Sequence, residues 1–96
     1  MEPIRYALIG CGRISANHVA AAQANNLNIV ALCDIDPACM QEKMEQFALT
    51  EQTHCYTDYQ TMLQKEQPTL VAIATESGKH AQIALDCLQA GCNVII

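Results

Sequence analysis

Short continuous apolar runs alternate along this chain with segments in which apolar residues recur every three or four positions. The continuous runs occupy residues 6–9, 28–33 and 70–74, and a fourth begins at residue 93. Runs of this kind are typical of strands that are covered on both faces of a parallel sheet. Residues 54–56 are a weaker candidate for a short strand between the second and third runs.

The segments between these runs carry signals for helix starts and stops. Asp36–Pro37 combines an N-cap with a first-turn proline, and Asp58 is placed to cap a helix that Pro68 ends. Asn25–Asn26 interrupts the first helical pattern, and Gly91 lies where a left-handed C-terminal cap belongs. Four helices are therefore expected. Their expected apolar faces are Ile14, His18 or Val19, and Ala22; Met40, Met44, Phe47 and Ala48; Met62 and Leu63; and Ala81, Ala84, Leu85 and Leu88.

Strands and helices thus alternate in the order βαβαβαβαβ. This order predicts an α/β fold with three layers, in which a doubly wound parallel sheet lies between helices and the crossovers are right-handed. The 96 residues are enough for one small domain, residues 1–96. Because the chain ends within an apolar strand that begins at residue 93, we expect this domain to be part of a longer protein.

A glycine-rich segment, Gly10-Cys11-Gly12-Arg13-Ile14-Ser15, joins the first run to the first helix. The first glycine permits a tight turn, the second lets the backbone approach a pyrophosphate, and the serine is small enough for close packing of helix and strand. The helix N-terminus adds N–H groups and a partial positive charge that favour phosphates. The pattern predicts a dinucleotide-binding Rossmann fold.

Asp34 strengthens this prediction and bears on the choice of cofactor. It lies 24 residues after Gly10, at the end of the second run, where an acid is expected to hydrogen-bond the adenine ribose. A carboxylate there repels a 2′-phosphate, and no Lys or Arg follows within residues 35–38, which favours NAD over NADP. Arg13 leaves two alternatives open, since its guanidinium either reaches a phosphate or lies in solvent at the helix start.

Charge and apolarity narrow the possible partners and location. The formal net charge of −5, with five scattered basic residues, argues against nucleic acid. No apolar run approaches the roughly 20 residues of a membrane span. Residues 1–5 lack the layout of a signal peptide, so we expect a cytoplasmic protein with no membrane partner.

Cysteine is the remaining compositional feature. Six cysteines admit either a disulfide framework or a set of small buried apolar residues. A cytoplasmic location favours reduced thiols, and no pair has Cys-x-x-Cys spacing, which argues against a zinc or redox site. We therefore expect buried thiols and no metal site. The cysteines are Cys11, Cys33, Cys39, Cys55, Cys87 and Cys92.

Three separated motifs resemble the Gfo/Idh/MocA family of oxidoreductases, over essentially the whole chain. The first is the glycine loop, and the second is Cys33-Asp34-Ile35-Asp36-Pro37. The third lies within residues 72–94, where Ala-Thr is followed by His80 and then by Ala-Leu and Ala-Gly pairs, as in that family. Two departures from the family pattern are Glu76, where proline is usual, and Cys92-Asn93, where Lys-His is usual.

The resemblance implies hydride transfer between NAD(P) and a hydroxyl or carbonyl carbon of a sugar, polyol or nucleotide sugar. It also implies that a Glu-Lys-Pro motif with a catalytic lysine, and a second domain that binds substrate, lie beyond the strand that begins at Val94. These 96 residues are then expected to bind the cofactor without turnover and to contain no catalytic residue. By the same resemblance, Gly10, Gly12, Arg13, Ile14, Asp34 and Thr75 line the cofactor. His80 either approaches the nicotinamide or hydrogen-bonds a loop.

Two other functions are alternatives to this one. The chain is alternatively a stand-alone, non-catalytic dinucleotide-binding or sensing module, which a stop codon directly after Ile96 would favour. A transferase that uses S-adenosylmethionine is disfavoured, because such proteins typically show Gly-x-Gly-x-Gly and this chain has Ile14 at the last position.

The apolar strand expected at residues 93–96 leaves an exposed edge of the sheet. Such an edge can pair with another chain, which predicts self-association.

Overall fold

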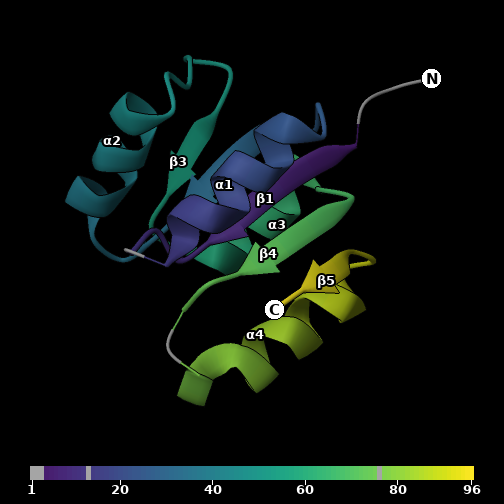
Figure 1. Ribbon diagram of the computed structural model, residues 1–96. Helices are drawn as coiled ribbons and strands as arrows, with labels where there is room; N and C mark the ends of the chain where they lie inside the picture. The colour runs from purple at the N-terminus through teal and green to yellow at the C-terminus, as the bar shows by residue number, and fades with distance from the viewer. Residues whose placement is uncertain (1–3, 13, 76) are drawn as a thin grey trace.

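The computed structural model describes residues 4–12, 14–75 and 77–96, and shows one sheet between two layers of helices (Figure 1). All strand pairs are parallel, in the order β3-β2-β1-β4-β5. The strands are β1 (Arg5–Ile9), β2 (Asn28–Cys33), β3 (His54–Tyr56), β4 (Leu70–Ile73) and β5 (Asn93–Ile95). The helices are α1 (Ser15–Ala24), α2 (Pro37–Gln46), α3 (Tyr59–Glu66) and α4 (Ser77–Gln89). The predicted doubly wound sheet is confirmed.

The direction of the strand order reverses at β1. The chain runs outward from β1 through β2 to β3, and then returns across the sheet to β4 on the other side of β1. Ile9, the last residue of β1, pairs with Cys33 of β2 and with Ile73 of β4. The carboxyl ends of these three strands therefore meet at one edge of the sheet. In doubly wound sheets, ligands bind outside that edge at the reversal.

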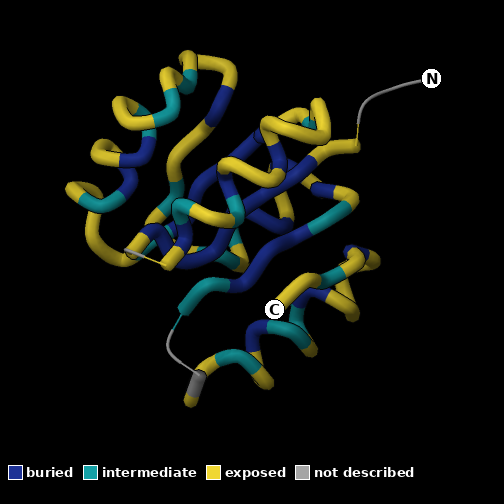
Figure 2. The backbone as a smooth tube through the Cα atoms, in the orientation of Figure 1, coloured by how far each residue is buried: buried dark blue, intermediate teal, exposed yellow. Residues whose placement is uncertain are grey.

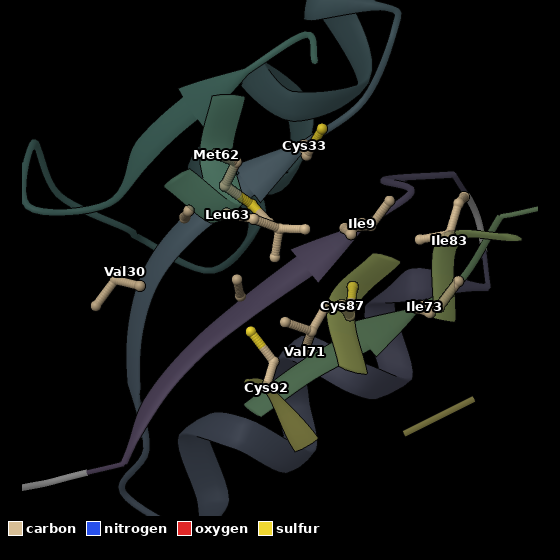
Figure 3. Packing of buried hydrophobic residues seen from close by; sticks show 12 residues of the cluster. Ile9, Val30, Cys33, Met62, Leu63, Val71, Ile73, Ile83, Cys87 and Cys92 are labelled. Atoms are coloured by element: carbon tan, nitrogen blue, oxygen red, sulfur yellow. The ribbon is translucent and has the colours of Figure 1, made fainter. Parts of the chain in front are cut away.

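Two apolar clusters cover the faces of the sheet. One lies between the sheet and helices α1 and α2, and it includes Leu8, Val19 and Met40. The other lies against α3 and α4 and includes Met62 and Cys87 (Figure 3). Burying one such aliphatic side chain contributes roughly 1.5–3 kcal/mol. The central strands are the most deeply buried part of the backbone (Figure 2), so the core holds the strand ends of the reversal in place.

The buried faces of α1 and α2 differ from the predicted ones at their ends. Ile14 is 73% exposed because it is the N-cap of α1 and precedes the first turn of the helix. The residues that α1 buries are Ser15, Val19 and Ala22. Ala48 is exposed because α2 ends at Gln46 and the backbone at Ala48 is left-handed, with φ of +53°. Helical spacing in the sequence continued past both of these boundaries.

Helix α4 packs through a face that is rotated from the predicted one. Its buried side chains are Ile83 and Cys87. Asp86 lies on the side toward α3, where its Oδ2 accepts a hydrogen bond of 2.5 Å from the Tyr59 hydroxyl. The exposed part of the predicted face comprises Ala81, Leu85 and Leu88. The chain therefore has apolar residues on two sides of this helix, and only one side contacts the sheet.

The predicted caps are confirmed. The Asp36 carboxylate accepts a hydrogen bond of 2.9 Å from the Ala38 N–H at the start of α2. Asp58 caps α3 in the same way. Gly91 follows α4 with φ of +90°, a backbone conformation that favours glycine.

The six cysteines are free thiols in different environments. Four of them are buried, as predicted, and Cys39 is half-buried. Cys55 is exposed because it lies on β3, the short strand at the edge of the sheet, so the prediction of burial is wrong there. Burial, reinforced by the nearby Asp34 carboxylate, raises the pKa of both Cys11 and Cys33 to about 12. These two thiols are poor nucleophiles.

Candidate functional site: a cavity at the carboxyl edge of the sheet

A cavity of about 520 Å³ lies at the carboxyl edge, where the strand order reverses. Four loops that follow β1, β2, β3 and β4 contribute to its lining. These lining residues include Gly10 and Gly12, Asp34 and Ile35, Asp58 and Tyr59, and Thr75 and Lys79. The cavity thus collects Gly10, Gly12, Asp34 and Thr75, four of the residues implicated by the sequence.

Gly10 makes the turn out of β1 against the loop after β4. Its φ is +95°, and a Cβ atom there would lie 2.7 Å from the carbonyl carbon of Ala74 and 2.8 Å from the Thr75 nitrogen. Both neighbouring atoms belong to the backbone, so neither can move aside easily. The tight turn predicted at this glycine is confirmed, and the structure adds a close backbone contact that no side chain would permit.

Gly12 differs from Gly10 because it faces open space. A Cβ atom at this position would meet no atom of the protein within 4 Å. The glycine is therefore not required for packing within the protein. Its place at the cavity, beside the start of α1, fits the prediction that a phosphate group approaches the backbone here.

Ser15 closes the glycine loop at the start of α1. Its side chain is fully buried, and its Oγ donates a hydrogen bond of 2.5 Å to the Gly12 carbonyl oxygen. The Ser15 N–H donates to the same oxygen at 3.1 Å. Sequence reasoning required only a small residue here. The structure shows that the hydroxyl also fixes the loop conformation.

Asp34 connects the glycine loop to the end of β2. Its Oδ2 accepts a hydrogen bond of 2.7 Å from the Cys11 N–H, and its Oδ1 accepts one of 2.8 Å from the Asp36 N–H. Each carboxylate oxygen has a second lone pair, so these bonds leave acceptor capacity for a ligand hydroxyl. No sequence pattern predicts the bond to Cys11, because the two residues meet only when β1 and β2 pair.

His80 lies in the first turns of α4 and hydrogen-bonds the loop before it. Its Nε2 contacts the Thr75 carbonyl oxygen. A carbonyl oxygen only accepts hydrogen bonds, so Nε2 carries the proton. This is one of the two alternatives that the sequence left open. His80 is not among the residues that line the cavity, and its approach to a nicotinamide stays a prediction.

The family resemblance also implicates Arg13 and Ile14 in cofactor binding. Arg13 lies outside the described residues, as does Glu76. Ile14 is exposed and is not part of the cavity lining. The contacts of Arg13 and Ile14 with a cofactor therefore remain predictions.

Sequence reasoning missed the contribution of the loop after β3. Asp58 and Tyr59 line the cavity because Tyr56 pairs with Cys33, which puts the ends of β2 and β3 side by side. The sequence does contain a signal, since residues 54–56 are a weak candidate for a strand and parallel strands end at the same edge of a sheet. Lys79 of α4 was missed as well and lines the same cavity.

A second hollow, of about 930 Å³, lies between α3 and α4. It is larger and more open, but its lining shares only Asp58 with the first cavity and includes no residue of the glycine loop. We therefore assign the candidate cofactor site to the smaller cavity. Within residues 4–12, 14–75 and 77–96, no group of three or more His, Cys, Asp or Glu side chains is placed to hold a metal ion.

Residues 4–96 match the GFO/IDH/MocA oxidoreductase family, NAD-binding Rossmann fold. The chain belongs to this family. It is 37% identical over 86 residues to D-apiose dehydrogenase from Paraburkholderia graminis, a match that covers 88% of this chain and 22% of that protein. It is 28% identical over 86 residues to inositol 2-dehydrogenase/D-chiro-inositol 3-dehydrogenase from Lactiplantibacillus plantarum, a match that covers 88% of this chain and 24% of that protein.

Solved structures agree with this assignment. The WlbA dehydrogenase from Chromobacterium violaceum, in complex with NADH and UDP-GlcNAcA, superposes with a TM-score of 0.85 at 32% identity, over 98% of this chain and 27% of that one. The scyllo-inositol dehydrogenase from Lactobacillus casei, with bound NAD(H) and scyllo-inositol, superposes with a TM-score of 0.84 at 22% identity. The match covers 97% of this chain and 27% of that one, and it shows the shared fold. The chain spans only 22–27% of the length of these relatives.

Proposed function

We propose that this chain is the cofactor-binding domain of an NAD-dependent oxidoreductase. The observation that carries the proposal is the cavity at the strand reversal, which has the open backbone of Gly12 and the anchored carboxylate of Asp34 in its lining. The proposed reaction is hydride transfer to or from a hydroxyl or carbonyl carbon of a sugar, polyol or nucleotide sugar. The named activities of D-apiose and inositol dehydrogenases support this substrate class.

The residues of the cavity fit a nicotinamide dinucleotide. The open space beside Gly12 supports placing a pyrophosphate there, and the N-terminus of α1 supplies a partial positive charge that favours it. The Asp34 oxygens keep acceptor capacity for the ribose hydroxyls while the Cys11 N–H holds the carboxylate in place. When bound, the cofactor supplies the hydride acceptor or donor. The chain's own residues bind and orient it.

We further propose that these 96 residues bind the dinucleotide without turning over substrate. Hydride transfer at a hydroxyl carbon requires a positioned group that takes or gives the hydroxyl proton. By the family resemblance, that group is a lysine that follows the strand beginning at Val94, together with residues of a substrate domain. The match to less than a third of each relative's length supports the same division of roles.

Titration calorimetry with NADH and NADPH tests the cofactor assignment. We expect NADH to bind more tightly than NADPH, and Asp34→Asn to weaken NADH binding by at least about tenfold, since one charge-assisted hydrogen bond contributes about 1.5–3 kcal/mol. Glu51→Gln is the matched control, because Glu51 is exposed in the turn before β3, at the opposite edge of the sheet. Failure of the unaltered chain to bind NADH would overturn the proposal.

We also propose that the isolated chain associates through β5. The Asn93 N–H donates to Thr69 at 2.9 Å, so alternation directs the backbone groups of Val94 to the unpaired edge. The strand carries no charge and no proline to protect that edge. Antiparallel pairing of two β5 strands about a two-fold axis would bring the exposed Leu85 and Leu88 of both α4 helices to the same face of one continuous sheet.

Light scattering at increasing concentration tests this association. We expect a dimer that the double substitution Leu85→Glu and Leu88→Glu abolishes through charge repulsion. The substitutions Ala20→Glu and Ala24→Glu, on the exposed side of α1, add the same charge elsewhere and are expected to leave the dimer intact. A monomer at millimolar concentration would refute the association and would leave the cofactor assignment unaffected.

The proposed location is the cytoplasm, with neither nucleic acid nor membrane as a partner. The net charge of −5 supports the exclusion of nucleic acid. In the part of the chain that the structure describes, no helix combines the length and the apolarity that crossing a membrane requires.

A further inference from the structure

The described lining of the cofactor cavity contains two carboxylates and one ammonium group. The carboxylates are those of Asp34, after β2, and Asp58, after β3, and the ammonium group is that of Lys79 in α4. The two acids follow neighbouring strands, and the Asp34 N–H donates a hydrogen bond of 3.1 Å to the Tyr56 carbonyl oxygen. A ligand that enters this cavity therefore meets two acidic side chains on adjacent loops.

The Asp58 carboxylate is held in one orientation as an anion. It accepts a hydrogen bond of 2.7 Å from the Thr61 hydroxyl and bonds of 3.3 Å from the N–H groups of Gln60 and Thr61. The hydroxyl bond first, and then the two backbone bonds, hold the pKa of Asp58 below its ordinary value. Asp58 is therefore ionised at neutral pH, and the cap of α3 fixes the orientation of its carboxylate at this edge of the sheet.

The pKa of the buried Cys33 thiol indicates that the charges of both carboxylates act at the end of β2. The pKa of Cys33 is raised to about 12 by burial first and then by the negative charges of Asp34 and Asp58. Cys33 is the last residue of β2 and itself lines the cavity. The fields of the two carboxylates thus overlap at the end of β2, where Asp34 is assigned to the adenine ribose.

We propose that Asp58 is a second determinant of cofactor specificity, which acts with Asp34 to disfavour the 2′-phosphate of NADP(H). The inference rests on the proposed function and deepens it. A phosphate monoester carries a charge of roughly −1.5 to −2 near neutral pH, so its repulsion by one more carboxylate is larger than that of a neutral hydroxyl. Lys79 is a single exposed cation and does not balance two carboxylates.

Two small probes isolate this effect, because they differ only in the 2′-phosphate. They are 5′-AMP and adenosine 2′,5′-bisphosphate, and the measurement is the ratio of their affinities by titration calorimetry. We expect Asp58→Asn to shift this ratio toward the bisphosphate by about three- to tenfold, as removal of one charge several ångströms away predicts. Asparagine keeps the N-cap of α3, and Asp58→Ser provides a second variant that also retains it. Circular dichroism confirms that each variant is folded.

A control variant and the salt dependence distinguish the effect of the local Asp58 charge on the affinity ratio from the effect of the protein's net charge. Glu51→Gln makes the same charge change at the opposite edge of the sheet, and we expect it to leave the ratio unchanged. The shift in Asp58→Asn should shrink in about 1 M salt, where the screening length is about 3 Å.

An unchanged ratio in Asp58→Asn and Asp58→Ser, with normal binding of NADH, would overturn this inference and leave the proposed function intact. Equal loss of both probes would show that Asp58 binds adenosine without discriminating the phosphate, and would also overturn it. Failure of the unaltered chain to bind NADH and both probes would refute the proposed function and, with it, the role of Asp58.

Discussion

Substituting alanine for Gly10 should destabilise the fold because the structure leaves no room for a Cβ atom. The backbone at Gly10 has φ of +95°, where an L-residue costs about 1–2 kcal/mol. The added carbon would lie 2.7 Å from Ala74 and 2.8 Å from Thr75, and displacing a packed backbone costs about 1–3 kcal/mol more. The expected loss of unfolding free energy is therefore about 2–5 kcal/mol, a large part of the roughly 5–14 kcal/mol available to a chain of this size.

Gly12→Ala is the matched control, since its Cβ atom would meet nothing within 4 Å. We expect its unfolding free energy to change by less than about 0.5 kcal/mol. Its NADH affinity should nevertheless fall by about tenfold or more, because the new methyl group occupies space that the pyrophosphate needs. The two neighbouring glycines would then separate a requirement of the fold from a requirement of the ligand.

Urea unfolding followed by circular dichroism measures the first effect, and calorimetric titration with NADH measures the second. A loss of about 3 kcal/mol lowers the urea midpoint of a small protein by roughly 2 M. Equal midpoints for Gly10→Ala and the unaltered chain would refute the steric argument. A midpoint for Gly12→Ala as low as that of Gly10→Ala would show that both glycines serve packing alone.

Two further predictions follow from the titratable groups. Burial by itself raises the pKa of Glu66, but hydrogen bonds from Tyr56 (2.5 Å) and His54 (2.7 Å) hold that pKa below its ordinary value of 4.5. The stability that these bonds contribute is therefore present above pH 4.5 and is lost as the pH falls below it. Urea midpoints measured from pH 6 to pH 3 should therefore fall more steeply for the unaltered chain than for Glu66→Gln, and parallel curves would contradict this. Iodoacetamide should label the exposed Cys55 in the folded chain. Cys87 is buried, and burial raises its pKa to about 11, so it should react only after unfolding. Mass mapping that finds both thiols labelled at the same rate would contradict this prediction.

The order of the helices and strands was set by the sequence alone, because each depends on short-range chemistry. Continuous apolar runs predicted the strands, and β3 was found at the predicted residues 54–56. Asp36 and Asp58 cap helices through bonds to N–H groups two or three residues away, which a local pattern can reveal. The turn at Gly10 and the position of Asp34 at the end of a strand were local for the same reason.

Tertiary structure decided which surfaces meet, because those contacts join residues far apart in the chain. The face that α4 buries depends on the sheet and on Tyr59 of α3, so periodicity alone favoured Leu85 and Leu88 over Ile83. The packing of Gly10 against the loop after β4 joins segments more than 60 residues apart. Asp34 likewise bonds the glycine loop, and lines one cavity with Asp58, only because β1, β2 and β3 lie side by side in the sheet.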